Sequence, residues 1–403
     1  MKKIVYSIVT CSLLVSSLSA EQDSNSVDSF KAMFQEGKTS GQLRAMYVSQ
    51  DPKETAATDT YATAAGAYLK FETAKYNGIN GAVALTYSED IKKASGDLDK
   101  NKRNDELSSS DGRYAQLSEA YLAYEGRFLD YKFGRQVIDT PLADSDDIRM
   151  VQNSFEAVTA EYKSDSLNVF MGYLNRWQGV DAGLDDEWVN TGHNGTTFIG
   201  ASYSNIIDAQ LWYYGINGGE NANHAVYAEL SYTHEFSEDI GLSVAAQYLN
   251  ESEQDKSAIE ANIYGAMVEL SVSDLTVGAA YNESSKEKNK SSFSGFGGGA
   301  LFTSMDIMIL DEITADRDAT SYVGGASYAL GDFSLFYAYG DFKGDPDSVG
   351  DKAHIVEQDM GVEYNYNDEF AAYVIYVKSE DRLSSVTNEN DWEHVRVMAS
   401  YSF

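Results

Sequence analysis

Apolar and polar residues alternate with a period of two along many short stretches of this chain. In residues 394–403, Val395, Val397, Ala399 and Tyr401 fall on one face, and polar side chains fall on the other. Period two indicates β-strands, whose successive side chains point to opposite faces. Because charged residues repeat on the second face, that face must contact water. The same period recurs in residues 42–48, 66–72, 167–176 and 226–232.

The pattern predicts about 18 strands, an even number, as single-chain outer-membrane barrels usually have. Junctions between the strands alternate between short and long. Short junctions fall at residues 77–78, 125–126, 164–165, 204–205, 238–239, 273–274, 331–332 and 365–368. Long polar junctions fall near residues 50–61, 89–113, 136–153, 176–195, 216–222, 250–257, 286–316, 342–352 and 379–391. A soluble sandwich or propeller has no reason to alternate in this way.

We therefore predict an all-β fold, a single transmembrane antiparallel β-barrel of about 18 strands with short periplasmic turns and long extracellular loops. Closure of the sheet pairs every backbone N–H and C=O group, which is what allows strands to face hydrocarbon. A soluble β-rich protein, the alternative, would expose an apolar outer wall to water. Pro52, Pro141 and Pro346 all lie in long junctions, as expected because Pro cannot donate to a β-ladder.

The N-terminal residues have the three regions of a secretory signal peptide. Two lysines precede an apolar run over residues 4–18, and small residues at 19–20 provide a cleavage site. The run is too short and too rich in Ser for a membrane-spanning helix, which needs about 20 apolar residues. We expect export through the Sec pathway. The expected division is a removed signal peptide over residues 1–20, a short periplasmic segment over 21–37 and the barrel over 38–403.

Composition then narrows the function. The 403 residues include 30 Lys and Arg against 63 Asp and Glu, a formal net charge of -33. This balance excludes nucleic-acid binding, which needs a basic face. The one Cys is Cys11, inside the predicted signal peptide, so the exported chain has no Cys for a disulfide or a Cys-based zinc site. We expect no cofactor and no catalytic metal.

Several motifs together carry a family resemblance. They are FKAMF at 30–34, GKTSGQLR at 37–44, SEAYL at 118–122, GRQ at 134–136, TPL at 140–142, NSFE at 153–156 and the Gly-rich run ending in LFTSM at 297–305. Across the whole mature chain the sequence resembles the OprD-type porins of Gram-negative outer membranes. The final residue, Phe403, also resembles the C-terminal signal that the barrel-assembly machinery reads, although an ordinary last strand would end similarly.

The resemblance implies an 18-stranded barrel that is monomeric or loosely trimeric. It implies that the long loops near 136–153 and 286–316 fold inward and narrow the pore. It also implies uptake of small carboxylates and basic amino acids, with acidic residues of the third loop facing a ladder of basic residues on the barrel wall.

Charged side chains at the narrowest point set the selectivity of a wide barrel. The third long loop is the predicted constriction, and Ser304 is the candidate in the seventh. An acidic, solvated surface loop is the alternative, but the flanking family motifs favour the constriction. The candidates in the third loop are Asp139, Asp144, Asp146, Asp147 and Arg149.

Basic residues that alternate with apolar neighbours are predicted to face the lumen. An Arg facing lipid at the midplane would cost about 2–4 kcal/mol. Each could instead pair with a lumen carboxylate such as Glu72 or Glu119. The predicted basic track consists of Arg44, Lys70, Lys132, Arg135, Arg176 and Arg396.

These features predict a porin for passive diffusion of small hydrophilic solutes, mildly cation-preferring because of the acidic balance. Expected partners are outer-membrane lipid, lipopolysaccharide, the assembly machinery and small solutes, and the expected assembly is a monomer or homotrimer. The alternative is a structural or adhesin barrel whose loops bind partners. An enzyme is disfavoured, because the catalytic site of a barrel enzyme needs a His with partners. The five histidines are scattered, at His193, His224, His234, His354 and His394.

Overall fold

The computed structural model describes residues 26–53, 57–96, 101–185, 188–217, 222–286, 289–293, 295–383 and 391–403. The predicted signal peptide and the first part of the predicted periplasmic segment lie outside these residues. The described chain begins with a short helix, α1 (Phe30–Gln35), capped by the Ser29 side chain, which accepts a hydrogen bond from Ala32 N–H. No helix in the described ranges is long and apolar enough to cross a membrane.

Strands make up most of the described chain. They are β1 (Lys38–Pro52), β2 (Thr60–Glu72), β3 (Ile79–Asp90), β4 (Arg113–Glu125), β5 (Asp130–Gln136), β6 (Ser154–Lys163), β7 (Leu167–Gln178), β8 (Val189–Asn190), β9 (Thr196–Ser204), β10 (Asp208–Ile216), β11 (Ala222–Ser237), β12 (Ile240–Asp255), β13 (Ala261–Val272), β14 (Leu275–Lys286), β15 (Ala319–Leu330), β16 (Phe333–Gly344), β17 (Ala353–Asn365), β18 (Phe370–Asp381) and β19 (Trp392–Ser402). The 3-10 turns η1 (Lys92–Ala94) and η4 (Leu310–Ile313) lie between them.

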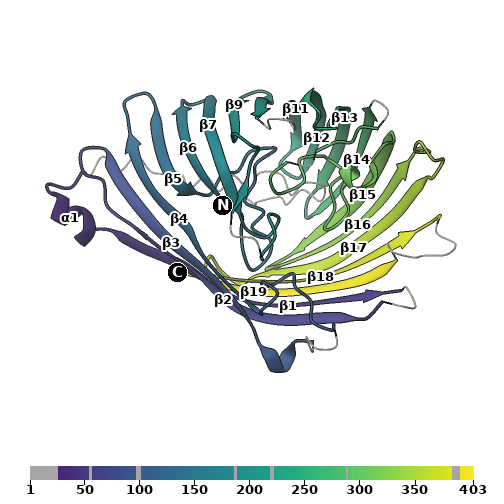
Figure 1. Ribbon diagram of the computed structural model, residues 1–403, viewed down its shortest axis with the longest axis horizontal. Coiled ribbons are helices and arrows are strands. Elements are labelled where there is room, and N and C mark those ends of the chain that lie inside the picture. The colour runs from purple at the N-terminus through teal and green to yellow at the C-terminus, as the bar shows by residue number, and fades with distance from the viewer. Residues whose placement is uncertain are drawn as a thin grey trace.

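The strands form one closed antiparallel sheet (Figure 1). Each wall strand pairs with its sequence neighbours, and β1 pairs with both β2 and β19. Phe403 completes the ring, because its N–H and C=O exchange hydrogen bonds with Gly41 at 3.0 and 2.9 Å. The two-residue β8 pairs with β7 alone and is an addition to the wall. The predicted barrel of about 18 strands is confirmed.

The two faces of each strand follow the alternation in the sequence. In β12, Val244 is 43% exposed on the outer face, whereas Ala245 and Gln247 are buried on the inner face. Outward apolar side chains such as Val244 form the surface that meets hydrocarbon, and inward side chains surround the lumen. The connections alternate as predicted, with short turns at one end of the barrel and long loops at the other.

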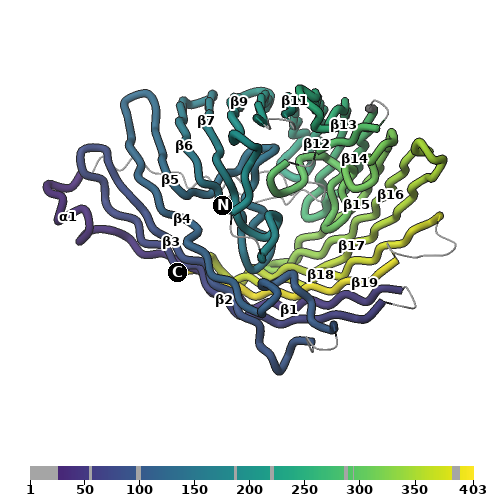
Figure 2. The backbone as a smooth tube through the Cα atoms, viewed as in Figure 1, coloured from purple at the N-terminus to yellow at the C-terminus, as the bar shows by residue number. Residues whose placement is uncertain are grey.

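Long loops fill much of the barrel interior (Figure 2). We name the described residues of four of them loop 2 (91–96 and 101–112), loop 3 (137–153), loop 4 (179–185 and 188–195, including β8) and loop 7 (289–293 and 295–318). Loops 3 and 7 contribute to one apolar core against the inner wall. This core includes Ile138 and Leu142 of loop 3, Phe155 and Trp177 of the wall, and Phe296 and Phe302 of loop 7.

Close contact between loops 3 and 7 depends on a glycine. Gly297 has φ of +91°, a left-handed conformation that side chains rarely adopt. A Cβ atom at this position would lie 2.6 Å from the carbonyl oxygen of Asp144, nearer than van der Waals contact allows. The glycine therefore lets the backbone of loop 7 lie directly against loop 3.

We predict that Gly297→Ala destabilises the folded barrel by about 1–3 kcal/mol more than a glycine substitution in open space. The control is Gly331→Ala, because Gly331 also has a positive φ (+62°) but nothing lies within 4 Å of its Cβ position. The two variants share the conformational strain, and Gly297→Ala adds the clash with loop 3. The measurement is the unfolding temperature in detergent, and equal losses in both variants would contradict the prediction.

Candidate functional site

Loops 3 and 7 meet inside the barrel through their backbones. Phe296 N–H donates to the carbonyl oxygen of Leu142 at 2.9 Å, and Asp144 N–H donates to the carbonyl oxygen of Phe296 at 3.1 Å. The Asn153 amide donates to the Asp144 carbonyl at 3.1 Å and to the Asp181 carboxylate of loop 4 at 2.6 Å. These bonds fix the position of the charged part of loop 3, which follows Asp144.

Arg149 of loop 3 is surrounded by carboxylates from three loops. Its Nη1 lies 2.7 Å from Oδ2 of Asp146 and 3.6 Å from Oδ1 of Asp181, and its Nε lies 3.2 Å from Oε1 of Glu106. The guanidinium of Arg149 therefore carries little uncompensated positive charge.

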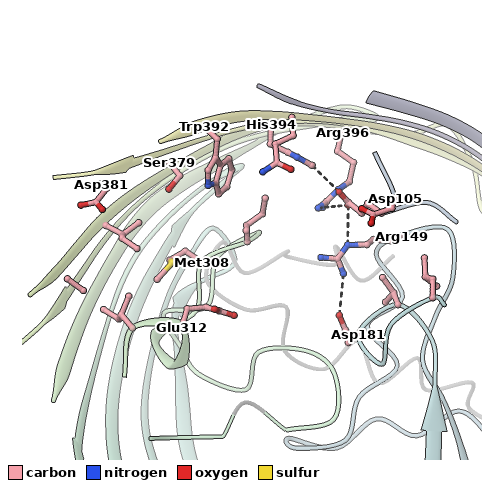
Figure 3. A pocket seen from close by; sticks show the side chains of 18 of the residues that line it. Asp105, Arg149, Asp181, Met308, Glu312, Ser379, Asp381, Trp392, His394 and Arg396 are labelled. Atoms are coloured by element: carbon pink, nitrogen blue, oxygen red, sulfur yellow. Dashed lines mark hydrogen bonds and ion pairs between the residues drawn. The ribbon is translucent and has the colours of Figure 1, made fainter. Parts of the chain in front are cut away.

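Arg396 projects from β19 of the barrel wall toward Glu106, one of the carboxylates that pair with Arg149. Its Nη2 lies 3.0 Å from Oε1 of Glu106 in loop 2, and its Nη1 lies 2.8 Å from Oδ1 of Asp306 in loop 7. Only 2% of its side chain is exposed. Figure 3 shows Arg396, Arg149 and Asp181 along one path across the lumen. Glu106 thus bridges a wall arginine and a loop arginine.

Arg44 of β1 extends this network along the wall. Its Nη1 lies 2.7 Å from Oδ1 of Asp147, and it also donates to the carbonyl oxygen of Arg149. From β18, the Tyr373 hydroxyl donates to the carbonyl oxygen of Ile148 at 2.8 Å. The wall thereby holds the tip of loop 3 from two sides.

The ion-pair network is negative overall. Three guanidinium groups, those of Arg44, Arg149 and Arg396, face five carboxylates, so the formal balance is -2. We call these eight residues the constriction network. Its carboxylates belong to Glu106, Asp146, Asp147, Asp181 and Asp306.

Burial changes the acidity of the loop carboxyls. Burial, with a smaller contribution from neighbouring carboxylates, raises the pKa of Asp144 to about 7. Burial and the adjacent Asp181 also raise the pKa of Asp146. Burial acts the same way on Glu106, but Arg396, His394 and Arg149 outweigh it and hold the pKa of Glu106 below its ordinary value. Glu106 is therefore an anion at neutral pH, whereas the charge of Asp144 changes near pH 7.

The constriction network lies between two cavities. The outer cavity, of about 820 Å³, opens toward the long-loop end and is lined by His354, Trp392 and Asp381 among others. The inner cavity, of about 720 Å³, reaches Glu363 in the half of β17 nearer the short turns. Arg149 and Arg396 line both cavities. The network therefore lies at the boundary between the two cavities.

Two residues of the predicted basic track lie lower on the wall, away from this network. Lys70 pairs with Glu119 at 3.0 Å, and the Lys132 ammonium lies 4.6 Å from the ring centroid of Tyr121. Lys132 lines a third cavity, of about 1050 Å³, near the short turns. The structure does not bring Lys70 or Lys132 together with Arg396.

Two more residues of the predicted track lie on the outer face of the barrel. Arg135 shares its face of β5 with Phe133, which is 66% exposed. Glu156 lies opposite both Arg135 and Arg176 in the sheet and pairs with Arg176 at 2.8 Å. Both guanidinium groups lie about 5 Å from the Trp188 ring, at 4.8 and 5.2 Å.

The remaining candidates take different places. Asp139 accepts a hydrogen bond from Ser145 N–H at 3.2 Å and lines the third cavity. Ser304 lines the inner cavity, and its Oγ has no hydrogen-bond partner among the described residues. Asp146, Asp147 and Arg149 belong to the constriction network, and Asp144 adjoins it.

Sequence reasoning missed Glu106 and Asp306 as parts of this site. Glu106 lies in a polar loop that carries none of the recognised motifs, so the sequence contains no signal for its role. Asp306 directly follows the LFTSM motif, whose family resemblance predicted that loop 7 folds inward but pointed to Ser304 alone. Within the described ranges, no group of three or more His, Cys, Asp or Glu side chains is arranged to hold a metal ion.

Comparison with known proteins supports one family. The model of the OprD family of outer membrane porins matches residues 31–403. No curated protein matches the sequence. Among solved structures, Pseudomonas aeruginosa OccK9 (OpdG) superimposes with a TM-score of 0.77 at 14% identity, covering 92% of this chain and 99% of that one. Acinetobacter baumannii OccAB4 gives 0.75 at 15% identity, covering 91% and 98%. Pseudomonas aeruginosa OpdK with vanillate gives 0.75 at 15% identity, covering 92% and 99%.

We predict that the preference for potassium over chloride rises as pH increases from 5.5 to 8.5. The reason is that the buried Asp144 carboxyl, with its pKa of about 7, gains its negative charge in this interval. Reversal potentials across a planar bilayer at the two pH values measure the effect. Asp144→Asn should reduce the pH step, whereas Asp165→Asn in a short turn should retain it. An unchanged step in Asp144→Asn would contradict the assignment.

Proposed function

This chain belongs to the OprD family of outer-membrane porins, and on that basis we propose that it conducts small cations and cationic solutes in preference to anions. The protein is a transmembrane β-barrel of the outer membrane. The members of this family are channels rather than enzymes. The preference for cations is the part that goes beyond family membership.

The observation that carries the proposal is the pairing of every guanidinium in the constriction network. Glu106 and Asp306 compensate Arg396, while Asp146 and Asp181, with Glu106, compensate Arg149. Because the carboxylates outnumber the arginines, the potential at the network is negative. A negative ring of side chains attracts cations and raises the energy of anions.

The same pairing opposes a carboxylate route along the arginines. A carboxylate solute would have to replace Glu106 or Asp147 as the partner of a guanidinium. Replacing such a partner leaves another buried carboxylate without compensation, which costs several kcal/mol in general. Arg135 and Arg176 do not extend the track, since they lie on the outer face of the wall.

The organisation of the chain forms part of the proposal. We propose that residues 1–20 are a signal peptide removed after Sec export, that 21–37 form a periplasmic segment and that 38–403 form the barrel. The short turns then face the periplasm and the long loops face outward. We also propose a monomer or homotrimer in contact with lipopolysaccharide, assembled by machinery that reads Phe403.

We predict that the purified protein gives discrete, cation-selective conductance steps in a planar bilayer. Asp147→Asn leaves Arg44 without its carboxylate and should lower the ratio of potassium to chloride permeability about threefold to fivefold, equivalent to roughly 1 kcal/mol. Asp165→Asn removes the same charge at a short turn and should leave the ratio unchanged. Reversal potential across a salt gradient is the measurement.

Two results would contradict this function. An anion-selective wild type would exclude the proposed preference. Absence of conductance from a correctly folded barrel would exclude the channel and favour a structural or adhesin role for the long loops.

A further inference from the structure

The inner cavity has an unusually acidic lining. Seven carboxylates and two arginines line its volume of about 720 Å³. Both arginines, Arg149 and Arg396, already pair with carboxylates of the constriction network. The uncompensated charge of this cavity is therefore negative, and it lies along β17, on the side nearer the short turns.

Asp306 and Asp359 are neighbouring carboxylates that line this cavity. In each of them one oxygen has a polar partner and the other has none. Asp306 Oδ1 pairs with Arg396 at 2.8 Å, but Asp306 Oδ2 has no hydrogen-bond partner. Asp359 Oδ2 accepts the N–H of Asp306 at 3.1 Å, but Asp359 Oδ1 has none. These two absences refer to the part of the chain that the structure describes. Asp359 is only 4% exposed.

An unpartnered oxygen on a buried carboxylate needs a physical explanation. Buried charges in proteins are normally paired or hydrogen-bonded, because the loss of hydration is otherwise uncompensated. Ser304 adds a third unpartnered polar atom on the same cavity wall. Three polar groups that lack partners around one cavity indicate a position for a hydrogen-bond donor from outside the chain.

A further carboxylate lies along the same face of β17. Successive inward residues of this strand are Glu357, Asp359, Gly361 and Glu363. Glu357 is used within the fold, since it accepts the N–H groups of residues 307 and 308 at 3.1 to 3.2 Å. The carboxylate of Glu363 has no hydrogen bond or ion pair to any described residue. Four residues of strand separate Asp359 from Glu363, about 13 Å.

Aromatic rings cover the wall between these two carboxylates. Phe336 of β16 lies opposite Gly361, and a Cβ on Gly361 would come 2.5 Å from the ring. Tyr373 of β18 lies directly opposite Glu363 in the sheet. Both rings line the cavity. Such rings contact an alkyl stem favourably, and their faces attract cations.

We propose that this cavity binds an organic cation that has two primary ammonium groups on an alkyl stem and lacks a carboxylate. One ammonium is held by Asp306, Asp359 and the Ser304 hydroxyl, and the other by Glu363, with the stem along Phe336 and Tyr373. This inference rests on the proposed cation preference and specifies its substrate class. Within the described ranges no three His, Cys, Asp or Glu side chains are arranged to hold a metal ion, so the cavity favours an organic cation.

The spacing of the carboxylates explains the preference for two charges. A monoamine can occupy one end and leaves the other uncompensated. A dicarboxylate meets like charge at both ends. A diamine compensates both ends at once, so the second contact is made within an already bound molecule.

The test measures block of potassium current by 1,5-diaminopentane in a planar bilayer at neutral pH. We expect half-block at a concentration at least about tenfold lower than for 1-aminopentane, and no block by glutarate. Asp359→Asn and Glu363→Gln should each raise the half-block concentration of the diamine about tenfold. The control is Glu161→Gln, which removes a carboxylate lining the third cavity and should leave the block unchanged.

Both variants are designed to preserve the fold. In Asp359→Asn the side-chain amide oxygen can still accept the Asp306 N–H, and no described residue forms a hydrogen bond or ion pair with the carboxylate of Glu363. Heat-modifiable migration in a gel verifies folding, and if Asp359→Asn misfolds, Glu363→Gln decides alone.

The outcomes separate this inference from the proposed function. Equal block of wild type, Asp359→Asn and Glu363→Gln would overturn the site. Equal potency of diamine and monoamine would also overturn it. In either case a cation-selective reversal potential would leave the porin function standing, whereas an anion-selective wild type would contradict both.

Discussion

In the hydrocarbon of a bilayer no water is present to hydrogen-bond an exposed amide, so every backbone polar group of a membrane wall must be paired within the protein. The closed ring of antiparallel strands meets this constraint, and the bonds between Phe403 and Gly41 complete it at the seam. Every other feature follows from the ring. Strand alternation places apolar residues outward and polar residues inward, and connections can lie only at the two ends of the barrel.

A ring of this size encloses more space than wall side chains can fill. Loops 3 and 7 occupy that space with an apolar core around Phe155 and Phe296, and this core positions the charged segment that follows Asp144. The arginines and carboxylates then lie in a partly dry environment, where an unpaired charge is costly. Dense pairing around Arg149 and Arg396 is the result, with five carboxylates for three arginines in the network.

The barrel and its loops could be predicted because their signals are local. Alternation and turn residues identified the strands, and the acidic run from Asp144 to Asp147 with Arg149 identified the charged loop. Inward and outward faces were harder to assign near strand ends. Arg135 follows the regular alternation of β5 and shares the outer face with Phe133, whereas a register irregularity between Glu156 and Ala157 moves Arg176 of β7 to the outer face.

By itself the sequence determined the acidic β-barrel and the loop that carries a dense run of charges, because periodicity, turns and charge runs are properties of neighbouring residues. Only the tertiary structure decided which charges meet. Glu106 and Arg396 are 290 positions apart, and no local pattern links them. The free oxygens of Asp306 and Asp359 likewise became visible only in the fold, because whether a carboxylate is compensated depends on groups that distant segments bring to it.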